Sequence, residues 1–357
     1  MWLPNDEMYR LYSCKTLSGN VPSWNEALEG ISKYDPAYMP YMIMYQEQYF
    51  VEKDEYYKDY SCVFYSDNRP VGVWPLCVYK RNGRYFIGTN GTTCMFPLIA
   101  DHLIGTKSHR KMADCYVRFL ARLCEEYKIS DFEMHFNYLL YKPDIVYEKL
   151  IRSNAIIQYS RHDLYVDLRQ GADYVWKGLR KRARTQINSA RKDLTCEIID
   201  NSCCALEDVV EQFRRLHISV AGRETRSEKT WKIQELTVRN SGSFIVLLKD
   251  SSEELIGALL VTSTPNVAQA SVAAYKRELF DKYALGHVCE MTAIERLCMQ
   301  GKQWYHIGAM PLPQDIPTPT DKEISIGVYK KGFCTDWTVL IKVIVTQDVL
   351  RGAIDKC

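Results

Sequence analysis

The chain has 357 residues, which is enough for about two domains that each bury a core of their own. Hydrophobic residues make up 46% and charged residues 25%, which excludes a disordered chain and indicates a folded globular protein. Because 46 basic and 44 acidic residues leave a net charge of only +2, any polyanionic partner has to be bound by a local patch.

The cysteines and the apolar runs indicate in which cellular compartment the protein is expected. The 13 cysteines include no C-x-x-C pair and an odd member, which favours reduced thiols over a disulfide scaffold or a metal site. The first seven residues lack the pattern of a secretion signal, and no uncharged run of 18 residues occurs. We therefore expect a cytoplasmic protein without a membrane span and without a bound metal.

The first half of the chain has the pattern of an α+β unit. Residues 1–60, interrupted by prolines, predict short helices with breaks. Apolar runs separated by turn residues predict an antiparallel meander of three strands over residues 62–65, 70–79 and 85–87. Apolar residues at helical spacing then predict a helix over residues 112–127, and a strand follows over residues 132–136.

The second half repeats this organisation at greater length. A strand over residues 163–168 precedes one basic helix over residues 174–192, and further helices are predicted over residues 206–220 and 285–299, the latter ended by Gly301. The remaining predicted strands cover residues 243–248, 255–262, 267–275, 304–308, 325–329 and 338–345. Because no alternating βαβ units occur, the order favours an α+β fold over a doubly wound parallel sheet.

The basic helix concentrates positive charge on one side. Between Trp176 and Lys192 there is no acidic residue, and the basic residues are Lys177, Arg180, Lys181, Arg182, Arg184, Arg191 and Lys192. At about 100° per residue, six of these seven lie beside an apolar face. Two interpretations remain open: a solvated basic face, or a site where a polyanion such as a pyrophosphate, coenzyme A or tRNA relieves the repulsion between like charges.

Four segments occur in an order that has a parallel in a known family: residues 179–192, residues 216–223 with Arg226, residues 283–294, and residues 329–333. Together they resemble the Fem peptidyltransferases and related acetyltransferases of the acyl-CoA N-acyltransferase (GNAT) fold, over roughly residues 155–345. The resemblance implies two tandem GNAT-like domains, each a mixed, mainly antiparallel sheet flanked by helices. Residues 1–155 would form a degenerate first domain and residues 156–357 the acyltransferase domain.

The resemblance also implies roles for individual side chains. Tyr329-Lys330-Lys331-Gly332-Phe333 matches the aromatic-Lys-x-Gly-Phe segment of Fem proteins, with Tyr for the usual Phe and Cys334 for the next glycine. In that family the lysine stabilises charge on the carbonyl under attack or contacts the phosphate of the donor, so Lys330 is the expected catalytic residue. A simple turn with solvated lysines is the alternative.

Substrate contacts are expected from several other residues. His217 and Arg223 match a Fem spacing of six residues, in which the arginine reaches the diphosphate of a nucleotide-linked substrate. The alternatives are a surface ion pair for Arg223, with Glu224 or Glu228, and a structural hydrogen bond for His217. The remaining expected substrate contacts are Arg180, Arg184, Arg226 and Tyr275.

The turn Leu285-Gly286-His287 opens a predicted helix, where free backbone N–H groups can bind a pyrophosphate or a carboxylate. In GNAT enzymes this is the site of the acyl-CoA phosphates, which makes these three residues the expected cofactor site. The GNAT motif carries several glycines, and only Gly286 stands in this turn. An orthodox acyl-CoA site, a Fem-like use of the cleft and an ordinary connector therefore all remain open.

Acyl transfer to an amine also needs a proton acceptor, unless the enzyme works by positioning alone. The sequence does not choose among the available acids and histidines, which are Glu133, His135, Glu224, His287, Glu290 and His306.

The expected function is transfer of an acyl group, with acyl-CoA slightly favoured as donor, to an amine of a cell-envelope precursor such as a nucleotide-linked sugar. One alternative is a Fem-type enzyme that takes an amino acid from aminoacyl-tRNA to a muropeptide precursor. No heptad run predicts a coiled-coil arm, and the small net charge gives tRNA little long-range attraction. A second alternative is a module that binds a nucleotide-linked sugar without turnover.

Overall fold

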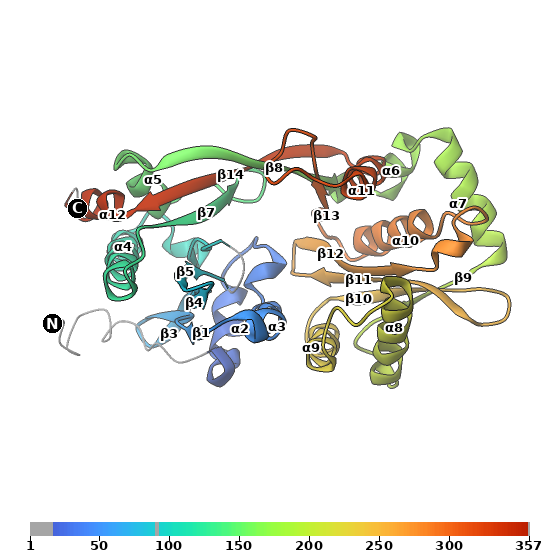
Figure 1. Cartoon of the computed structure of the whole chain (residues 1–357), viewed down its shortest axis with the longest axis horizontal. Helices are drawn as coiled ribbons and strands as arrows, with labels where there is room; N and C mark the ends of the chain where they lie inside the picture. The colour runs from blue at the N-terminus through green and yellow to red at the C-terminus, as the bar shows by residue number, and fades with distance from the viewer. Residues whose placement is uncertain (1–16, 90–92, 356–357) are drawn as a thin grey trace. The chain divides into compact units, whose positions relative to one another are not determined.

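The computed structural model describes residues 17–89 and 93–355, and the chain divides into two compact units (Figure 1). Unit 1 comprises Met1–Ser160 and Val339–Cys357, and unit 2 comprises Arg161–Thr338. Strands β8 (Ile156–Asp167) and β14 (Asp336–Thr346) each continue from one unit into the other. The first seven residues, where we expect no secretion signal, lie outside the described residues. Within residues 17–89 and 93–355, no helix combines the length and the apolar character needed to cross a bilayer.

Unit 1 contains both helices and short strands. Its helices are α2 (Val21–Glu29), α3 (Pro40–Phe50), α4 (Lys107–Tyr127), α5 (Ile145–Arg152) and α12 (Gln347–Asp355). Its strands are β1 (Tyr56–Asp59), β2 (Cys62–Ser66), β3 (Arg69–Trp74), β4 (Cys77–Arg81), β5 (Arg84–Gly88), β6 (Leu98–Ile99) and β7 (Asp131–Asn137), with the end of β14. The short helices of the first 60 residues, the helix around residues 112–127 and the strand around residues 132–136 are confirmed where the structure describes them.

The predicted three-stranded meander is wrong in one respect. The middle strand, predicted over residues 70–79, breaks at Pro75 and Leu76 into β3 and β4. These two strands belong to different three-stranded sheets, with orders β2-β3-β6 and β1-β4-β5. Proline has no N–H to donate to a sheet, so a strand that passes through Pro75 is disfavoured.

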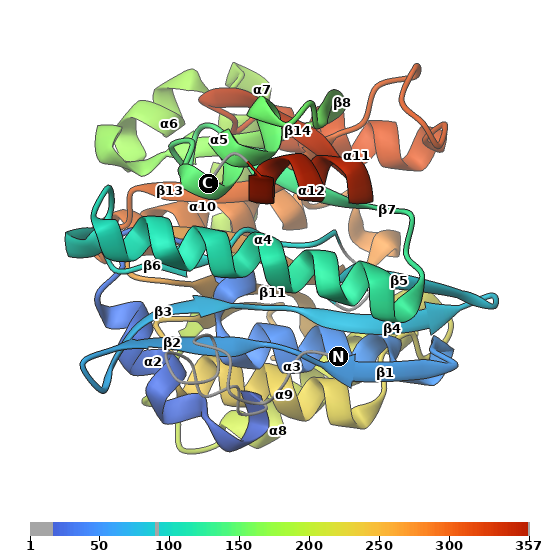
Figure 2. The same ribbon diagram turned by 90° about the vertical axis from the view of Figure 1, so that its left-hand side faces the viewer.

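Two apolar clusters hold unit 1 together. In one, α4, α5 and α12 pack on strands through residues such as Leu120, Leu150 and Leu350, each almost fully buried. In the other, α2 packs on β2 and β3 through Trp24, which is 1% exposed. Figure 2 shows α4 as the long helix that crosses this unit. Its start is capped by the Thr106 hydroxyl, which accepts a hydrogen bond from the His109 backbone N–H.

Unit 2 is built on one sheet. Its remaining strands are β9 (Thr195–Ile199), β10 (Phe244–Lys249), β11 (Leu255–Ser263), β12 (Val267–Tyr275) and β13 (Trp304–Met310). Its helices are α6 (Ala172–Gly178), α7 (Lys181–Asp193), α8 (Leu206–Ala221), α9 (Glu228–Arg239), α10 (Leu285–Met299) and α11 (Asp321–Lys331). The strands follow the order β8-β13-β12-β11-β10-β9, and neighbouring strands in this order are antiparallel except for the parallel pair β12–β13.

The sheet of unit 2 lies between two helical layers, as Figure 1 shows. On one face, α6, α7 and α10 bury residues such as Val175, Ile187 and Ile294 against the strands. On the other face, α8 and α9 do so with Phe213 and Trp231. The helix predicted over residues 285–299 coincides with α10, and Gly301 adopts a positive φ of 70° just after it. This three-layered α+β unit agrees with the expected fold class.

Two predicted elements of unit 2 are wrong. The single basic helix over residues 174–192 is in fact α6 and α7, because Leu179 and Arg180 between them are extended and the Leu179 side chain is buried in the core. The strand predicted over residues 325–329 is part of helix α11. That helix starts with a capping box, in which Thr320 and Glu323 bind each other's backbone N–H groups.

Candidate functional site

The centre of the candidate site is a place where two parallel strands separate. Strands β12 and β13 pair only through residues 267–269 and 304–306. Beyond these residues both strands continue, β12 to Tyr275 and β13 to Met310. Among the described residues, no strand pairing joins residues 270–275 of β12 to residues 307–310 of β13.

Lys330 lies at this opening. It belongs to the last turn of α11, and it is partly buried. Gly308 of β13 is its closest backbone neighbour: a Cβ atom added to Gly308 would lie 2.5 Å from Lys330 Nζ. Burial lowers the pKa of Lys330, and the nearby carboxylate of Glu290 partly offsets this. The ammonium of the predicted catalytic residue therefore lies against β13, and Lys330 is not a solvated lysine in a surface turn.

Glu290 is the acidic group of the site. Its side chain projects from α10 and is 4% exposed. The hydroxyl of the fully buried Tyr305, on β13, donates a 2.7 Å hydrogen bond to Glu290 Oε2. Burial raises the pKa of Glu290 above its usual value, and the Tyr305 hydrogen bond and the charge of Lys330 offset this only in part.

The first turn of α10 is covered by aromatic side chains. The rings of Tyr329 and Phe333 contact the His287 ring, at centroid distances of 4.8 and 5.6 Å. Burial raises the pKa of the Tyr329 hydroxyl well above its usual value, and in the described chain this hydroxyl has no hydrogen-bond partner. The Tyr275 ring also approaches Gly286. Of the three expected cofactor-site residues, Leu285 buries its side chain in the core, while Gly286 and His287 face this aromatic cluster.

Gly286 leaves no room for a larger residue. A Cβ atom added there would lie 2.8 Å from the Tyr329 hydroxyl oxygen. We expect Gly286→Ala to destabilise the protein by about 1–3 kcal/mol in urea unfolding. The double variant with Tyr329→Phe should recover part of this loss, because it removes that oxygen. As a control, Gly242→Ala should change stability by less than about 0.5 kcal/mol, since its nearest atom would be 3.6 Å away. Equal losses in both single variants would contradict the expectation.

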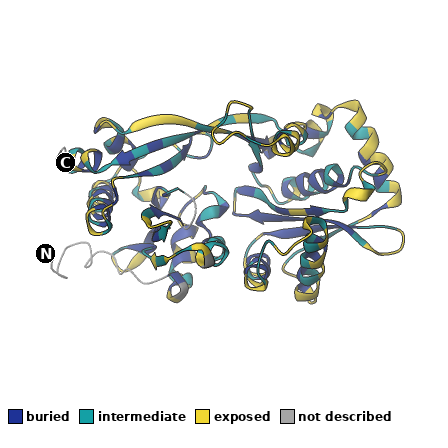
Figure 3. Ribbon diagram, in the orientation of Figure 1, coloured by how far each residue is buried: buried dark blue, intermediate teal, exposed yellow. Residues whose placement is uncertain are grey.

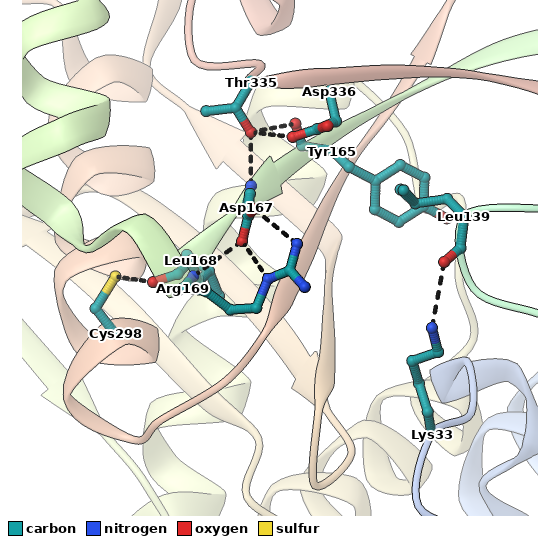
Figure 4. A network of polar contacts seen from close by, with 9 residues as sticks. All are labelled: Lys33, Leu139, Tyr165, Asp167, Leu168, Arg169, Cys298, Thr335 and Asp336. Atoms are coloured by element: carbon teal, nitrogen blue, oxygen red, sulfur yellow. Dashed lines mark hydrogen bonds and ion pairs between the residues drawn. The ribbon is translucent and has the colours of Figure 1, made fainter.

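The chain just after Lys330 is anchored to β8, which fixes the end of α11. Phe333 is 2% exposed in the core. The backbone N–H of Thr335 donates to the carbonyl of Tyr165, and the Thr335 hydroxyl accepts a 2.6 Å hydrogen bond from the N–H of Asp167 (Figure 4). Arg169 binds both carboxylate oxygens of Asp167 at 2.8 Å. Lys330 is thus held by a rigid segment.

Of the residues expected to bind a diphosphate, Arg223 and Arg226 lie on the α8–α9 connection and His217 lies in α8. Arg226 Nη1 lies 2.9 Å from His217 Nε2, and burial together with the arginine charge lowers the pKa of His217 to about 4. The neutral ring accepts the hydrogen bond from the arginine. Arg223 is exposed, and Glu224 pairs with Arg214 at 2.7 Å. No hydrogen bond or ion pair among the described residues joins this group to Lys330.

The basic residues around the α6–α7 break form a surface that we name the α6–α7 cationic surface. Its members are Lys177, Arg180, Lys181, Arg182, Arg184 and Lys192. All are exposed except the partly exposed Arg184, and no ion pair is found for them in the described chain. Figure 3 shows exposed stretches along α6 and α7. Arg191 differs, because its guanidinium binds both carboxylate oxygens of Glu295, at 3.1 and 2.8 Å. Two of the expected substrate contacts, Arg180 and Arg184, belong to this surface, and no hydrogen bond or ion pair among the described residues joins them to Lys330.

Two of the acids and histidines considered for proton handling are connected to the α11 end: the charge of Glu290 acts on Lys330, and the His287 ring contacts the rings of Tyr329 and Phe333. Glu133 forms an ion pair with Lys342 at 3.0 Å, and His306 stacks on the Tyr165 ring. Burial lowers the pKa of His287. Within the described residues, no group of three or more His, Cys, Asp or Glu side chains is placed to hold a metal ion.

Three residues of this site were not anticipated as functional: Tyr305, Gly308 and the hydroxyl of Tyr329. Tyr305 has the sequence context of an ordinary apolar strand residue, and nothing in that context indicates a functional role. A glycine within a strand often marks a bulge or a close approach of another group, and Gly308 was the available signal. The strand pairing indeed shifts register between His306 and Gly308.

Comparison with known proteins supports the fold. FemX matches with a TM-score of 0.62 and 10% identity, over 94% of this chain and 98% of FemX. L-PGS from Bacillus licheniformis matches with a TM-score of 0.58 and 9% identity, over 93% and 96% of the two chains. The C-terminal domain of a putative lysylphosphatidylglycerol synthetase from Agrobacterium fabrum matches with a TM-score of 0.52 and 11% identity, over 94% of this chain and 96% of that domain.

No protein-family model matches the chain, and no curated protein sequence matches it. At identities near 10% the structural likeness concerns the fold alone. The expected α+β fold class is confirmed, and the fold of the chain is similar to that of FemX.

Proposed function

We propose that the protein transfers an acyl or aminoacyl group from an activated donor to an amine of a cell-envelope precursor. The observation that carries this proposal is the partly buried Lys330 at the opening between β12 and β13. An ammonium held against the strand backbone suits the stabilisation of negative charge on a carbonyl oxygen. The Fem-type fold supports the same reaction class.

The reaction needs few groups. The amine attacks the donor carbonyl, the C–N bond forms, the bond from carbon to the carrier sulfur or oxygen breaks, and the amine proton passes to the leaving group or to water. The positive charge of the Lys330 ammonium stabilises the negative charge that develops on the carbonyl oxygen. The Tyr329 hydroxyl, protonated at neutral pH and without a partner in the described chain, is a second donor.

Transfer assays test this proposal directly. The protein is incubated with a nucleotide-linked amino sugar or a muropeptide precursor, and with either acyl-CoA or aminoacyl-tRNA, and the amide product is detected by mass spectrometry. Product from one donor and not the other identifies the donor. If neither donor gives product while a nucleotide-linked sugar raises the melting temperature, the protein is a binding module and the transferase proposal fails.

The α6–α7 cationic surface favours aminoacyl-tRNA as the second candidate donor. Six basic side chains without ion pairs in the described chain exceed what one pyrophosphate can neutralise, and they match the repeated charges of a nucleic acid. The single glycine of the α10 turn and its aromatic cover give acyl-CoA phosphates less support.

If tRNA is the donor, removing charge from this surface weakens its binding in a salt-dependent way. For the triple variant Arg180→Ala, Lys181→Ala and Arg184→Ala, we expect the slope of log Kd against log salt concentration to fall by about 2. The control pair Lys107→Ala and Lys111→Ala changes exposed lysines of α4 and should leave the slope unchanged. Equal slopes for all three proteins in filter binding would exclude this surface as the tRNA contact.

A further inference from the structure

A buried carboxylate, that of Glu290, lies on the α10 face of the unit 2 sheet, and its charge acts on the partly buried ammonium of Lys330. Glu290 is 4% exposed, and its neighbours along α10, Cys289 and Met291, are buried in the apolar core. An ionised carboxylate in such a place is strongly unfavourable unless hydrogen bonds or an opposite charge compensate for the lost hydration. The position of Glu290 therefore needs an explanation beyond packing.

Strand β13 supplies that explanation, because it contacts both charged groups. Tyr305 donates its hydroxyl to Glu290 Oε2 at 2.7 Å. Three residues further along the strand, Gly308 lies against the ammonium of Lys330. In the described chain no hydrogen bond or ion pair joins Glu290 to Lys330 directly. The carboxylate thus acts on the ammonium through the electric field across a low-dielectric interior.

The other titratable groups around the pair are neutral near pH 7. They are Tyr275 on β12, Tyr305 on β13, His287 and Cys289 on α10, and Tyr329 on α11. Burial raises the pKa of the three tyrosines and of Cys289, and it lowers the pKa of His287. Since these groups are neutral, Glu290 is the acidic group whose ionised form can offset the burial of the Lys330 ammonium.

We propose that Glu290 is a positioning residue for Lys330: fixed by the Tyr305 hydroxyl, its carboxylate keeps the ammonium charged and directed at the opening between β12 and β13. This inference rests on the proposed acyl transfer, because it assigns Lys330 to the developing charge on the carbonyl. The amide oxygen of a glutamine can accept the same hydrogen bond from Tyr305, so Glu290→Gln removes the charge and retains the contact.

The pH dependence of transfer tests the role of Glu290. If the charged form of Lys330 is active, the rate falls as the pH rises through the pKa of Lys330. Without the Glu290 charge that pKa is lower, so the upper limb of the profile for Glu290→Gln should move to lower pH by about one unit. Above both pKa values this corresponds to a further tenfold loss of rate. Glu295→Gln, one turn further along α10 and paired with Arg191, is the control and should not move the limb.

A second measurement does not depend on activity. Nuclear magnetic resonance titration of the Lys330 side chain, assigned with Lys330→Arg, should give a lower pKa in Glu290→Gln than in the unchanged protein. If Glu290→Gln lowers the rate equally at every pH and leaves this titration unchanged, the proposal is overturned. If the titration moves but no donor gives product, the coupling of Glu290 to Lys330 stands and the proposed transferase function fails.

Discussion

Replacing Lys330 by methionine is expected to lower kcat/KM for acyl transfer by about 10²–10³-fold. Methionine keeps much of the length and the apolar stem, so packing against Gly308 is largely retained while the positive charge is lost. Because the charge acts on the carbonyl oxygen mainly in the transition state, most of the loss should appear in kcat and little in KM. Steady-state kinetics with the donor identified by the transfer assays give both constants.

The neighbouring lysine is a matched control for this experiment. Lys331 is exposed, and its ammonium lies 4.7 Å from the centre of the Trp337 ring. Lys331→Met removes the same charge one residue away and should change kcat/KM by less than about threefold. If Lys330→Met retains activity within that range, Lys330 is not the group that stabilises the transition state, and the binding-module interpretation gains support.

The elements that sequence predicts best are those whose pattern is local. Helix α10 is predicted with its correct bounds because its apolar spacing is regular and Gly301 follows it. Helix α9 is not predicted, since Gln234 and Glu235 stand on its buried side and hide the apolar period. Glu235 is tolerated there because Lys232 and Arg239 bind its carboxylate. Such compensation depends on side-chain geometry and leaves no mark in hydropathy.

The error at α11 has a different cause. The run from Ser325 to Tyr329 alternates in a way that suggests a strand, but Thr320 and Glu323 carry the sequence signature of a helix start. Reading that signal would have placed Lys330 in the last turn of a helix. The α6–α7 break was also signalled, by Gly178 within an otherwise continuous basic run.

The candidate site is predictable only in part. A family-like motif points to Lys330, and the structure places the preceding residue, Tyr329, against Gly286 and His287. The positioning role of Glu290 could not be predicted from the sequence, because its burial and the Tyr305 hydrogen bond come from residues distant in sequence. For the same reason the sequence did not separate the α6–α7 and α8–α9 basic groups from Lys330.

Adding one methyl group at Gly308 is expected to remove most of the activity without changing any charged residue. The new Cβ atom would lie 2.5 Å from Lys330 Nζ, so the ammonium has to move away from β13. A displacement of about 1 Å at a catalytic group lowers the rate by roughly 100-fold. Gly308 also has a φ of 128°, which side-chain-bearing residues rarely adopt, so a loss of about 1–3 kcal/mol in stability should accompany the effect.

A second glycine separates the effect on Lys330 from the effect on the backbone. Gly301 has a φ of 70°, and a Cβ atom added there would meet no atom within 4 Å. Gly301→Ala should therefore destabilise the protein by about 1–2 kcal/mol while kcat stays unchanged.

A double variant that combines Gly308→Ala with Lys330→Met tests whether Gly308 acts through Lys330. Gly308→Ala should add little to the loss caused by Lys330→Met, since both changes act through the same ammonium. Additive losses in kcat would mean that Gly308 acts on the reaction by a route other than Lys330.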